Sequence, residues 1–374
     1  MSKPPRRVAR IIRLLARVTL GVVVLAIVAG GVAWMRSDNE CPAPGSPVEG
    51  DAMRGYLRCD YGPPSVLRLA SLSRPVPADS EVLVRIHAVS LNPADWHELR
   101  GTPAVARIGM GLRKPAGLRI GSDFAGVVEL VGSRVSRFQP GDSVWGARTG
   151  AFAEYVTVRE GRLMPKPARI TLEQAAAIPV AAVTALQGVR DQGGVRSGQR
   201  VLVNGASGGV GTFAVQVAKA MGAHVTGVCS SRNVALVQSL GADRVIDYTT
   251  TDFTTLGERY DVIVDMVGNH SLSALGGVLA SGGTYVMVGG PKGDWIDPLP
   301  RAAATVARGW IGKERWRFFI ASFSTPDLTY LNELVESGRM TPVVDRTYPF
   351  DSLPAAMEYL ESGRARGKVV VRVP

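Results

Sequence analysis

The chain has 374 residues, which is long enough for two domains that share a substantial apolar core. Its formal net charge is +11, but seven of its Lys and Arg residues, and no acidic residue, lie within residues 1–36. Most of the positive excess is therefore local, and the rest of the chain has an ordinary charge balance, which argues against a nucleic-acid partner. The chain has only 3 cysteines, which excludes a structural zinc site with four cysteine ligands.

The basic N-terminus is followed by an uncharged, mostly apolar stretch at residues 18–35. Eighteen helical residues span ~27 Å, close to the ~30 Å hydrocarbon core of a bilayer. The pattern predicts a single-pass N-terminal membrane anchor, and its basic flank places the rest of the chain outside the cytoplasm. A cleaved signal peptide and a start at Met53 are the alternatives.

Residues 37–52 are rich in Pro and Gly and predict a linker. Cys41 and Cys59 bracket its end, so they are placed to form a disulfide in an oxidising compartment or to stay two separate thiols in the cytosol.

Two folding patterns follow the linker. Residues 53–178 contain short alternating strands separated by Gly and Pro turns, which predicts a β-rich domain. In residues 179–323, strands alternate with helix-length segments, which predicts a doubly wound parallel sheet with right-handed crossovers, an α/β arrangement. Residues 324–374 add two helices and end in an apolar strand at 368–373.

The most informative segment is residues 201–211, Val-Leu-Val-Asn-Gly-Ala-Ser-Gly-Gly-Val-Gly, in which a strand meets a glycine-rich turn that opens a helix. A second strand follows and ends at Cys229, which completes a βαβ unit of the kind that binds dinucleotides. Glycines permit the tight turn and let backbone N–H groups approach a pyrophosphate. The turn predicts cofactor contacts from Gly205, Ser207, Gly208, Gly209, Val210 and Gly211.

The end of the second strand indicates which cofactor is bound. Chains that bind NAD usually place an acidic residue here for the ribose 2′-hydroxyl, but this chain has Ser230, Ser231 and Arg232. Two hydroxyls and a guanidinium suit a 2′-phosphate, so NADP(H) is predicted. Alternatively, a serine caps a helix and the arginine is simply exposed.

With the glycine turn placed, residues 53–374 resemble the zinc-independent quinone oxidoreductase branch of the medium-chain dehydrogenase/reductase superfamily. The resemblance implies a GroES-like catalytic domain at 53–178, a Rossmann NADP-binding domain at 179–323 and a return to the catalytic domain at 324–374. The apolar segment at 18–35 lies outside it. The matching motifs are Asn92-Pro-Ala-Asp-Trp-His-Glu-Leu-Arg-Gly, Gly121-Ser-Asp-Phe-Ala-Gly-Val-Val, Pro140-Gly-Asp-Ser-Val, Gly150-Ala-Phe-Ala-Glu-Tyr-Val and Arg366-Gly-Lys-Val-Val, besides the glycine turn.

No metal is expected. Relatives that use zinc carry a cysteine where this chain has Asn92, and Gly-His-Glu where it has Gly121-Ser-Asp. Without a metal, the reaction must need little carbonyl polarisation, which suits hydride addition to a quinone or an α,β-unsaturated carbonyl.

By resemblance, Asn92 and Asp95 lie beside the nicotinamide and its ribose, with Asn92 the candidate oxyanion donor. A plain helix start, in which Asn92 caps and Asp95 stands three residues later, is the alternative. Tyr155 is a candidate proton donor, and a tyrosine that packs on the sheet is the alternative. Further cofactor contacts implied by the resemblance are Thr184 at the nicotinamide, Tyr248 and Val267 at the adenine and ribose, and Lys368 at the phosphates unless it is a surface lysine.

The sequence thus predicts an NADPH-dependent reductase tethered to a membrane. The alternative is a catalytically quiet NADPH-binding sensor or membrane scaffold. A homodimer is a further expectation from relatives, and residues 300–323, basic and aromatic, suit a cleft wall, a dimer-facing strand or a membrane-surface helix. The side of the membrane stays open, because cytoplasmic supply of the cofactor conflicts with the basic flank.

Overall fold

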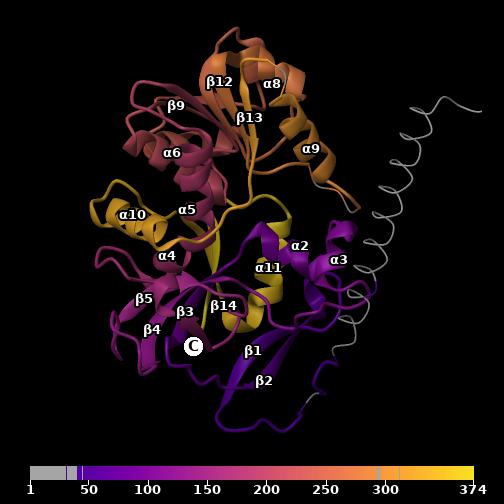
Figure 1. The fold of residues 1–374 in the computed structure, drawn as a ribbon, viewed down its shortest axis with the longest axis vertical. Coiled ribbons are helices and arrows are strands. Elements are labelled where there is room, and N and C mark those ends of the chain that lie inside the picture. The colour runs from indigo at the N-terminus through magenta and orange to yellow at the C-terminus, as the bar shows by residue number, and fades with distance from the viewer. Residues whose placement is uncertain (1–30, 32–39, 44, 292, 294, 311) are drawn as a thin grey trace, which may run out of the picture.

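The computed structural model describes residues 31, 40–43, 45–291, 293, 295–310 and 312–374. Figure 1 shows two halves, each built around a large sheet. The C-terminal segment, drawn in yellow, runs back from the upper half to the lower half, which also holds the early strands. The chain therefore crosses between the halves more than once, and the second crossing carries residues that matter for the site.

The lower half contains a sheet that has seven strands in the described part of the chain. Its order is β14-β15-β3-β4-β5-β7, with β6 on β3, and all pairs except β14–β15 are antiparallel. A separate antiparallel pair, β1–β2, precedes it. The strands are β1 (Ala52–Arg58), β2 (Leu67–Ser73), β3 (Glu81–Ser90), β4 (Asp123–Val131), β5 (Ser143–Ala147), β6 (Tyr155–Arg159), β7 (Leu163–Pro165), β14 (Val344–Pro349) and β15 (Lys368–Arg372).

The upper half contains a parallel sheet that has six strands among the described residues, in the order β10-β9-β8-β11-β12-β13. Because β8 comes first in sequence yet lies in the middle, the connections leave it in opposite directions and open a crevice at the carboxyl ends of β8 and β11. The α/β fold class predicted from sequence is confirmed. The strands are β8 (Arg200–Asn204), β9 (His224–Cys229), β10 (Arg244–Asp247), β11 (Tyr260–Asp265), β12 (Leu279–Met287) and β13 (Arg315–Phe318).

Helices join the two halves through one apolar core. Buried residues of α5, α6 and α10 share this core with Ala88, Ala125 and Trp145 of the lower sheet. The indole N–H of Trp145 also donates to Asn332 of α10 at 3.0 Å. The helices are α2 (Pro93–Arg100), α3 (Arg107–Met110), α4 (Leu172–Ala176), α5 (Pro179–Leu186) with a π-helical turn after it (Gln187–Gln192), α6 (Gly209–Ala220), α7 (Val234–Ser239), α8 (Leu272–Val278), α9 (Leu299–Arg308), α10 (Thr325–Glu336) and α11 (Leu353–Glu361).

Short 3₁₀ turns complete the secondary structure at Pro64–Val66, Ala104–Ala106, Glu160–Arg162, Ser231–Asn233, Phe253–Thr255 and Phe350–Ser352. The strands of the lower sheet lie before residue 166 and after residue 343, and those of the upper sheet lie between 200 and 318. The domain boundaries at 178 and 323 stay predictions.

The single-pass membrane anchor predicted for residues 18–35 is corrected. Within residues 40–374, apart from the few positions not described, and at residue 31, no helix is both long and apolar enough to cross a bilayer. The other residues of the 18–35 stretch lie outside the described residues. The prediction rested on an uncharged run near the lower limit of the ~17–25 residues that a spanning helix needs, and a run of that length does not by itself establish insertion.

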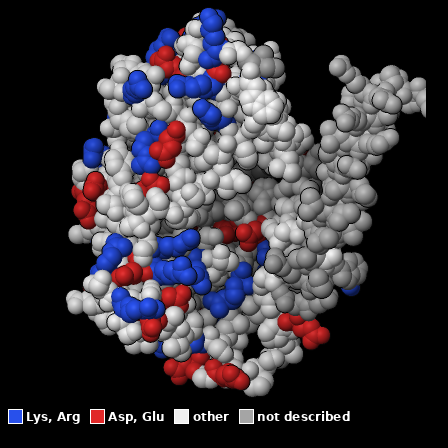
Figure 2. All heavy atoms as spheres, viewed as in Figure 1, with Lys and Arg blue, Asp and Glu red and all other residues white. Residues whose placement is uncertain are grey.

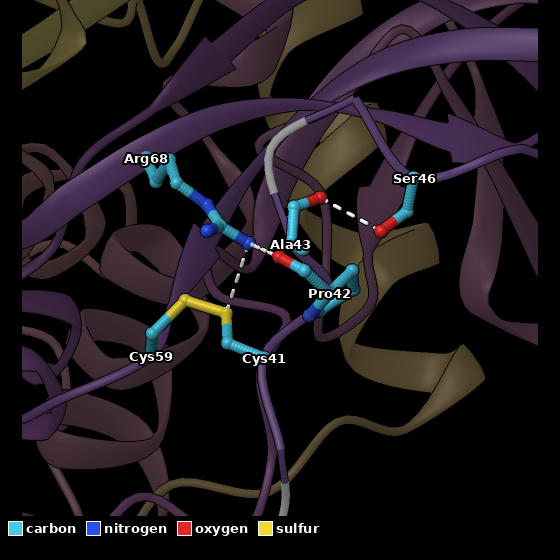
Figure 3. The surroundings of a disulfide bond; sticks show 6 residues. All are labelled: Cys41, Pro42, Ala43, Ser46, Cys59 and Arg68. Carbon is cyan, nitrogen blue, oxygen red and sulfur yellow. Dashed lines mark hydrogen bonds between the residues drawn. A yellow bond between two sulfur atoms is a disulfide. The ribbon is translucent and has the colours of Figure 1, made fainter.

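The pairing of Cys41 and Cys59, left open by the sequence, is resolved. The two residues form a disulfide with their Cα atoms 5.5 Å apart (Figure 3). The guanidinium of Arg68 on β2 donates to Cys41 Sγ at 3.2 Å and to the carbonyl of Pro42. The disulfide therefore ties the linker to the residue that follows β1. The third cysteine, Cys229, is buried on β9, and burial raises its pKa to about 11.

Candidate active site

The glycine turn stands at the carboxyl end of β8, where the crevice opens. Gly205 has a φ of 85°, a left-handed conformation that favours glycine, and its carbonyl accepts the N–H of Gly208 at 3.1 Å. A Cβ added at Gly211 would lie 2.1 Å from that same carbonyl oxygen, so no larger residue fits. The turn therefore passes directly beneath the first turn of α6 and leaves the helix N-terminus open. This cradle fits the pyrophosphate of a dinucleotide.

The other predicted residues around the turn hold it in place. Ser207 accepts a hydrogen bond from Asn233 at 2.9 Å, and its carbonyl accepts the N–H of Gly367 at 2.9 Å. Gly209 and Val210 form the start of α6 and are half-buried. Their position makes their backbone N–H groups the ones that a bound pyrophosphate would meet.

Val267 lies across the crevice from the turn. A Cβ at Gly205 would come within 2.9 Å of Val267 Cγ2, so the two loops are in contact. The buried carboxylate of Asp265 accepts the N–H groups of Val267 and Gly268 at 3.0 and 2.9 Å and the amide of Asn204 at 2.8 Å. These bonds link the ends of β8 and β11.

The residues predicted to select the 2′-phosphate lie at the end of β9. Ser230 is half-buried and accepts from Asn233, and Ser231 shares a 2.9 Å hydrogen bond with Thr249. The guanidinium of Arg232 donates to the carbonyl of Arg364 at 2.8 Å. This contact brings a second arginine beside Arg232 from a residue 132 positions later in the chain, which sequence reasoning missed.

Two more residues complete this end of the crevice. Tyr248, which follows β10, is 58% exposed and so is available to a ligand. Asp247 precedes it, and hydrogen bonds from Ser231 and Thr249 lower the pKa of its carboxyl. The end of β9 is therefore not purely basic, because this carboxylate lies close to Ser231.

A buried polar cluster lies in the lower half, at the ends of β3, β4 and β15. The ammonium of Lys368 donates to Asn92 Oδ1 at 2.5 Å and lies 3.3 Å from Asp123 Oδ2. Asp123 Oδ2 also accepts from Asn92 Nδ2 at 2.9 Å and from Ser90 Oγ at 3.1 Å, while Oδ1 accepts the N–H of Val180 at 3.0 Å. Burial raises the pKa of Asp123, and the Lys368 ammonium and these donors oppose the rise.

Asp123 was not among the predicted site residues. The sequence signal was present, because Asp123 stands where relatives that use zinc have the last residue of Gly-His-Glu, yet it was interpreted only as the loss of a ligand. Its position at the first residue of a strand whose next five residues are apolar is the cue that was overlooked.

Asn92 and Asp95 form the helix start that was one of the two alternatives, and their place beside the nicotinamide and its ribose stays a prediction. Asn92 precedes α2 in an extended conformation, and its backbone N–H donates to Asp95 Oδ2 at 2.6 Å, which is the contact expected at a helix start. The Asn92 side chain meanwhile points to Asp123 and Lys368. Burial is the main cause that raises the pKa of Asp95 to about 8, and the charges of Asp123 and Glu98 act in the same direction.

The raised pKa of Asp95 predicts a pH-dependent stability. Since the folded state binds this proton more tightly than the unfolded state does, the contribution is fully present below about pH 4 and is lost as pH rises through about 8. In Asp95→Asn the amide oxygen keeps an acceptor for Asn92 but cannot titrate. We expect urea unfolding to show that the wild type loses free energy of unfolding relative to Asp95→Asn between pH 5 and about 8.5. A difference that stays flat across this range would contradict the prediction.

Lys368 connects the glycine turn with the polar cluster. A Cβ built on Gly209 would lie 3.2 Å from Lys368 Cδ, and Gly367 pairs with Gly208 as a parallel bridge. The stem of Lys368 thus passes the N-terminus of α6, and its head reaches Asn92 and Asp123. The side chain is 3% exposed, so it is not a surface lysine. The predicted contact of Lys368 with cofactor phosphates stays a prediction.

Thr184 lies close to this cluster. It is on α5, one turn after Val180, and its hydroxyl donates to the Val180 carbonyl at 2.7 Å. Because the Val180 N–H donates to Asp123, Thr184 lies one helical turn from a residue that contacts the cluster, and its contact with the nicotinamide stays a prediction.

Tyr155 lies outside the cluster formed by Asn92, Asp123 and Lys368. It pairs with Arg85 of β3, and directly paired residues project from the same face of a sheet, which here is the exposed face. The guanidinium of Arg74 lies 4.3 Å from its ring centroid. The structure therefore groups Tyr155 with Arg74 and Arg85 and not with Asn92 and Asp123, which agrees with the packing alternative and gives the role of proton donor no support.

The face of the molecule that Figure 2 draws is hollowed between the two halves. Basic and acidic side chains both lie along the lower margin of the hollow. The mixed charge is consistent with a site for a small polar or conjugated molecule and does not form the continuous basic surface that a nucleic acid needs.

Two protein families match the chain. Residues 78–168 match the alcohol dehydrogenase GroES-like domain, and residues 240–371 match a family described as zinc-binding dehydrogenase. The mitochondrial NAD(P)H oxidoreductase RTN4IP1 of Mus musculus is 38% identical over 86% of this chain and 89% of its own length. The 2-methylene-furan-3-one reductase of Solanum lycopersicum is 34% identical over 85% of the chain and 79% of its own length.

A solved structure, the quinone oxidoreductase from Coxiella burnetii, matches with a TM-score of 0.75 and 30% identity, over 87% of this chain and 100% of that one. The chain therefore belongs to the medium-chain dehydrogenase/reductase superfamily. Its relatives there are oxidoreductases of the quinone-oxidoreductase type, and their names together with the nucleotide-binding fold support NADP(H) as the cofactor. The matches support neither membrane association nor a homodimer, and the relative from Mus musculus is named as mitochondrial.

Proposed function

We propose that this chain is an NADPH-dependent, zinc-independent reductase that transfers a hydride to quinones or α,β-unsaturated carbonyl compounds. The observation that carries the proposal is the contact between the glycine turn and the buried Asn92–Asp123–Lys368 cluster, made by the stem of Lys368. A dinucleotide cradle and a set of buried hydrogen-bond donors thus adjoin each other. Two relatives support the substrate class through their names, one a quinone oxidoreductase and one a reductase of a methylene furanone.

The chain's own groups can hold such a cofactor. The N-terminus of α6 binds the pyrophosphate through backbone N–H groups, and Ser231 and Arg232 receive the 2′-phosphate. Thr184 borders the reacting end, and Val267 borders the adenine and ribose. When bound, the reduced cofactor supplies the hydride. The chain orients the acceptor, excludes water and stabilises the negative charge that develops on the acceptor oxygen.

What occupies the centre of the cluster supports the proposal of zinc independence. The Lys368 ammonium lies between Asn92 Oδ1 and Asp123 Oδ2, so a fixed positive charge already stands among the oxygen atoms. Among the residues that the structure describes, no group of three His, Cys, Asp or Glu side chains is arranged to hold a metal ion. We expect turnover to survive treatment with a strong chelator, and a loss of turnover that zinc restores would overturn this part of the proposal.

The function is tested by mixing the purified full-length protein with NADPH and a panel of small quinones and enones. The absorbance of the dihydronicotinamide is followed with time. We expect turnover with at least one acceptor class, and a fall in turnover when Asn92 becomes Ala, because Asn92 orients the buried cluster. Tight NADPH binding without turnover on any acceptor would instead favour a binding protein that works as a sensor.

The preference for NADPH over NADH predicts a selective effect of Arg232→Ala. Loss of a charge-assisted hydrogen bond to phosphate is worth about 1.5–3 kcal/mol, so KM for NADPH should rise roughly 10- to 100-fold while KM for NADH stays the same. Initial-rate kinetics with both cofactors measure this. Arg134→Ala is the matched control, since Arg134 is exposed and pairs with Asp79 away from the crevice. An equal rise for both cofactors would show that Arg232 does not read the 2′-phosphate.

A further inference from the structure

We propose that Lys368 is the general acid of the reaction and delivers a proton to the reduced acceptor, with Asn92 and Asp123 as its positioning residues. This inference rests on the proposed function and deepens it. It replaces Tyr155, which the sequence suggested as proton donor, with a residue from the far end of the chain.

The hydrogen bonds of the Lys368 ammonium leave one of its N–H donors for a ligand. A lysine ammonium has three N–H donors. Among the described residues, Asn92 Oδ1 and Asp123 Oδ2 take two of them, at 2.5 and 3.3 Å. The third is available to a ligand in the crevice. Asn92, by contrast, already uses an amide N–H on Asp123, so it is better placed to orient Lys368 than to act as the sole oxyanion donor.

The partners of Lys368 are held rigidly. Asp123 is fixed by Ser90 and by the N–H of Val180 in the first turn of α5, where the helix dipole also favours a carboxylate. Asn92 is fixed at the start of α2 by Asp95. The stem of Lys368 is confined by the glycine turn at Gly209. The ammonium therefore has one well-defined position, and that position is beside the place where the cofactor binds.

A bound NADPH would supply a hydride to the β-carbon of an enone, and the electron pair of the C=C bond would move to leave an enolate with its charge on oxygen. A Lys368 N–H bond then breaks, its electron pair stays on Nζ, and the proton forms a new bond to the enolate. With a quinone, the same proton goes to the phenolate oxygen. The neutral amine takes a proton from water before the next turnover.

The carboxylate that pairs with the Lys368 ammonium is Asp123, which approaches from β4 with Oδ2 3.3 Å from Nζ. Asp95 approaches from α2, but burial raises the pKa of its carboxyl to about 8, so at neutral pH it is mostly protonated and adds little negative charge. The Asp123 carboxylate therefore favours the protonated amine, which is restored after each cycle.

The test compares Lys368→Met, which removes the acid, with Lys368→Arg, which keeps the charge but does not release a proton at neutral pH. Full-length protein is used throughout, with thermal unfolding to establish folding and Lys368→Gln as a second neutral variant. We expect both Met and Arg variants to lower kcat for an enone about 10²- to 10⁴-fold. We also expect the solvent deuterium isotope effect on kcat of both variants to differ from that of the wild type. With electron-poor quinones, whose reduced oxygens depend less on a proton, the variants should lose less of their kcat.

The outcomes separate the assignments. If Lys368→Arg keeps the wild-type kcat, the lysine supplies charge only, and the proton-donor assignment is wrong. If Lys368→Met keeps kcat but weakens NADPH binding, Lys368 is a phosphate contact, and the assignment is again wrong. Failure of the proposed function looks different, since the wild type itself would then bind NADPH and reduce no acceptor, which would remove both proposals.

Discussion

Replacing Gly211 by alanine is expected to lower the free energy of unfolding by about 2–3 kcal/mol and to abolish measurable NADPH binding. The added Cβ would lie 2.1 Å from the carbonyl oxygen of Gly205 and 2.9 Å from the backbone of Ala206. Both are main-chain atoms of the turn and cannot move aside as a flexible side chain would. The turn must therefore open, which breaks the cradle at the N-terminus of α6. Urea unfolding of the cofactor-free protein and a fluorescence titration with NADPH measure the two effects.

Gly208→Ala is the matched control in the same turn. Gly208 has a φ of −80°, and a Cβ there would meet nothing closer than 3.4 Å. We expect the stability of the cofactor-free protein to change by no more than about 0.5 kcal/mol, while NADPH binding weakens because the new methyl group faces the pyrophosphate. If the two alanine variants destabilise the cofactor-free protein equally, the steric argument for Gly211 is wrong.

Replacing Asp123 by alanine is expected to have the largest effect on stability, about 3–5 kcal/mol. The substitution leaves the Lys368 ammonium buried without its carboxylate partner, and it also removes the acceptor of Ser90 and of the Val180 N–H. An uncompensated buried charge is more costly than the loss of the ion pair itself. Chemical unfolding at neutral pH measures the loss, and reductase turnover should disappear with it.

A double variant tests the reason for this loss. In Asp123→Leu combined with Lys368→Met, neither charge remains and the buried volume stays filled. We expect its stability to return to within about 1–2 kcal/mol of the wild type, although turnover stays absent. If the double variant is as unstable as the sum of its single changes, Asp123 and Lys368 do not act as a pair.

The fold could be predicted from the sequence because the patterns that indicate it are local. Alternating apolar strands, helix-length spacers and the glycine turn at 205–211 each depend on residues within one turn or strand of each other. The same holds for Gly205 and Gly211, whose conformations serve contacts within their own loop. The anchor at 18–35 was also a local pattern, but it lacked a second signal of the kind that the strands beside the glycine turn provide.

The buried polar cluster was harder to predict, because its members come from distant parts of the chain. Lys368 meets Asn92 across a sequence separation of 276 residues and Asp123 across 245 residues. Each residue alone suggests something else. Asn92 suggests a helix start, Asp123 a lost metal ligand and Lys368 a phosphate contact, whereas Tyr155, the candidate proton donor, lies beside Arg74.

Short-range chemistry in this chain therefore specifies the two-domain α/β architecture, the dinucleotide cradle and the absence of an acid at the end of β9. The tertiary structure alone determines which side chains share the buried site, since β15 must return to the lower sheet before Lys368 can reach Asn92 and Asp123. It also brings Arg364 to Arg232 and joins Cys41 to Cys59. The physical reason is that burial and charge pairing depend on where segments meet in space, which no local pattern records.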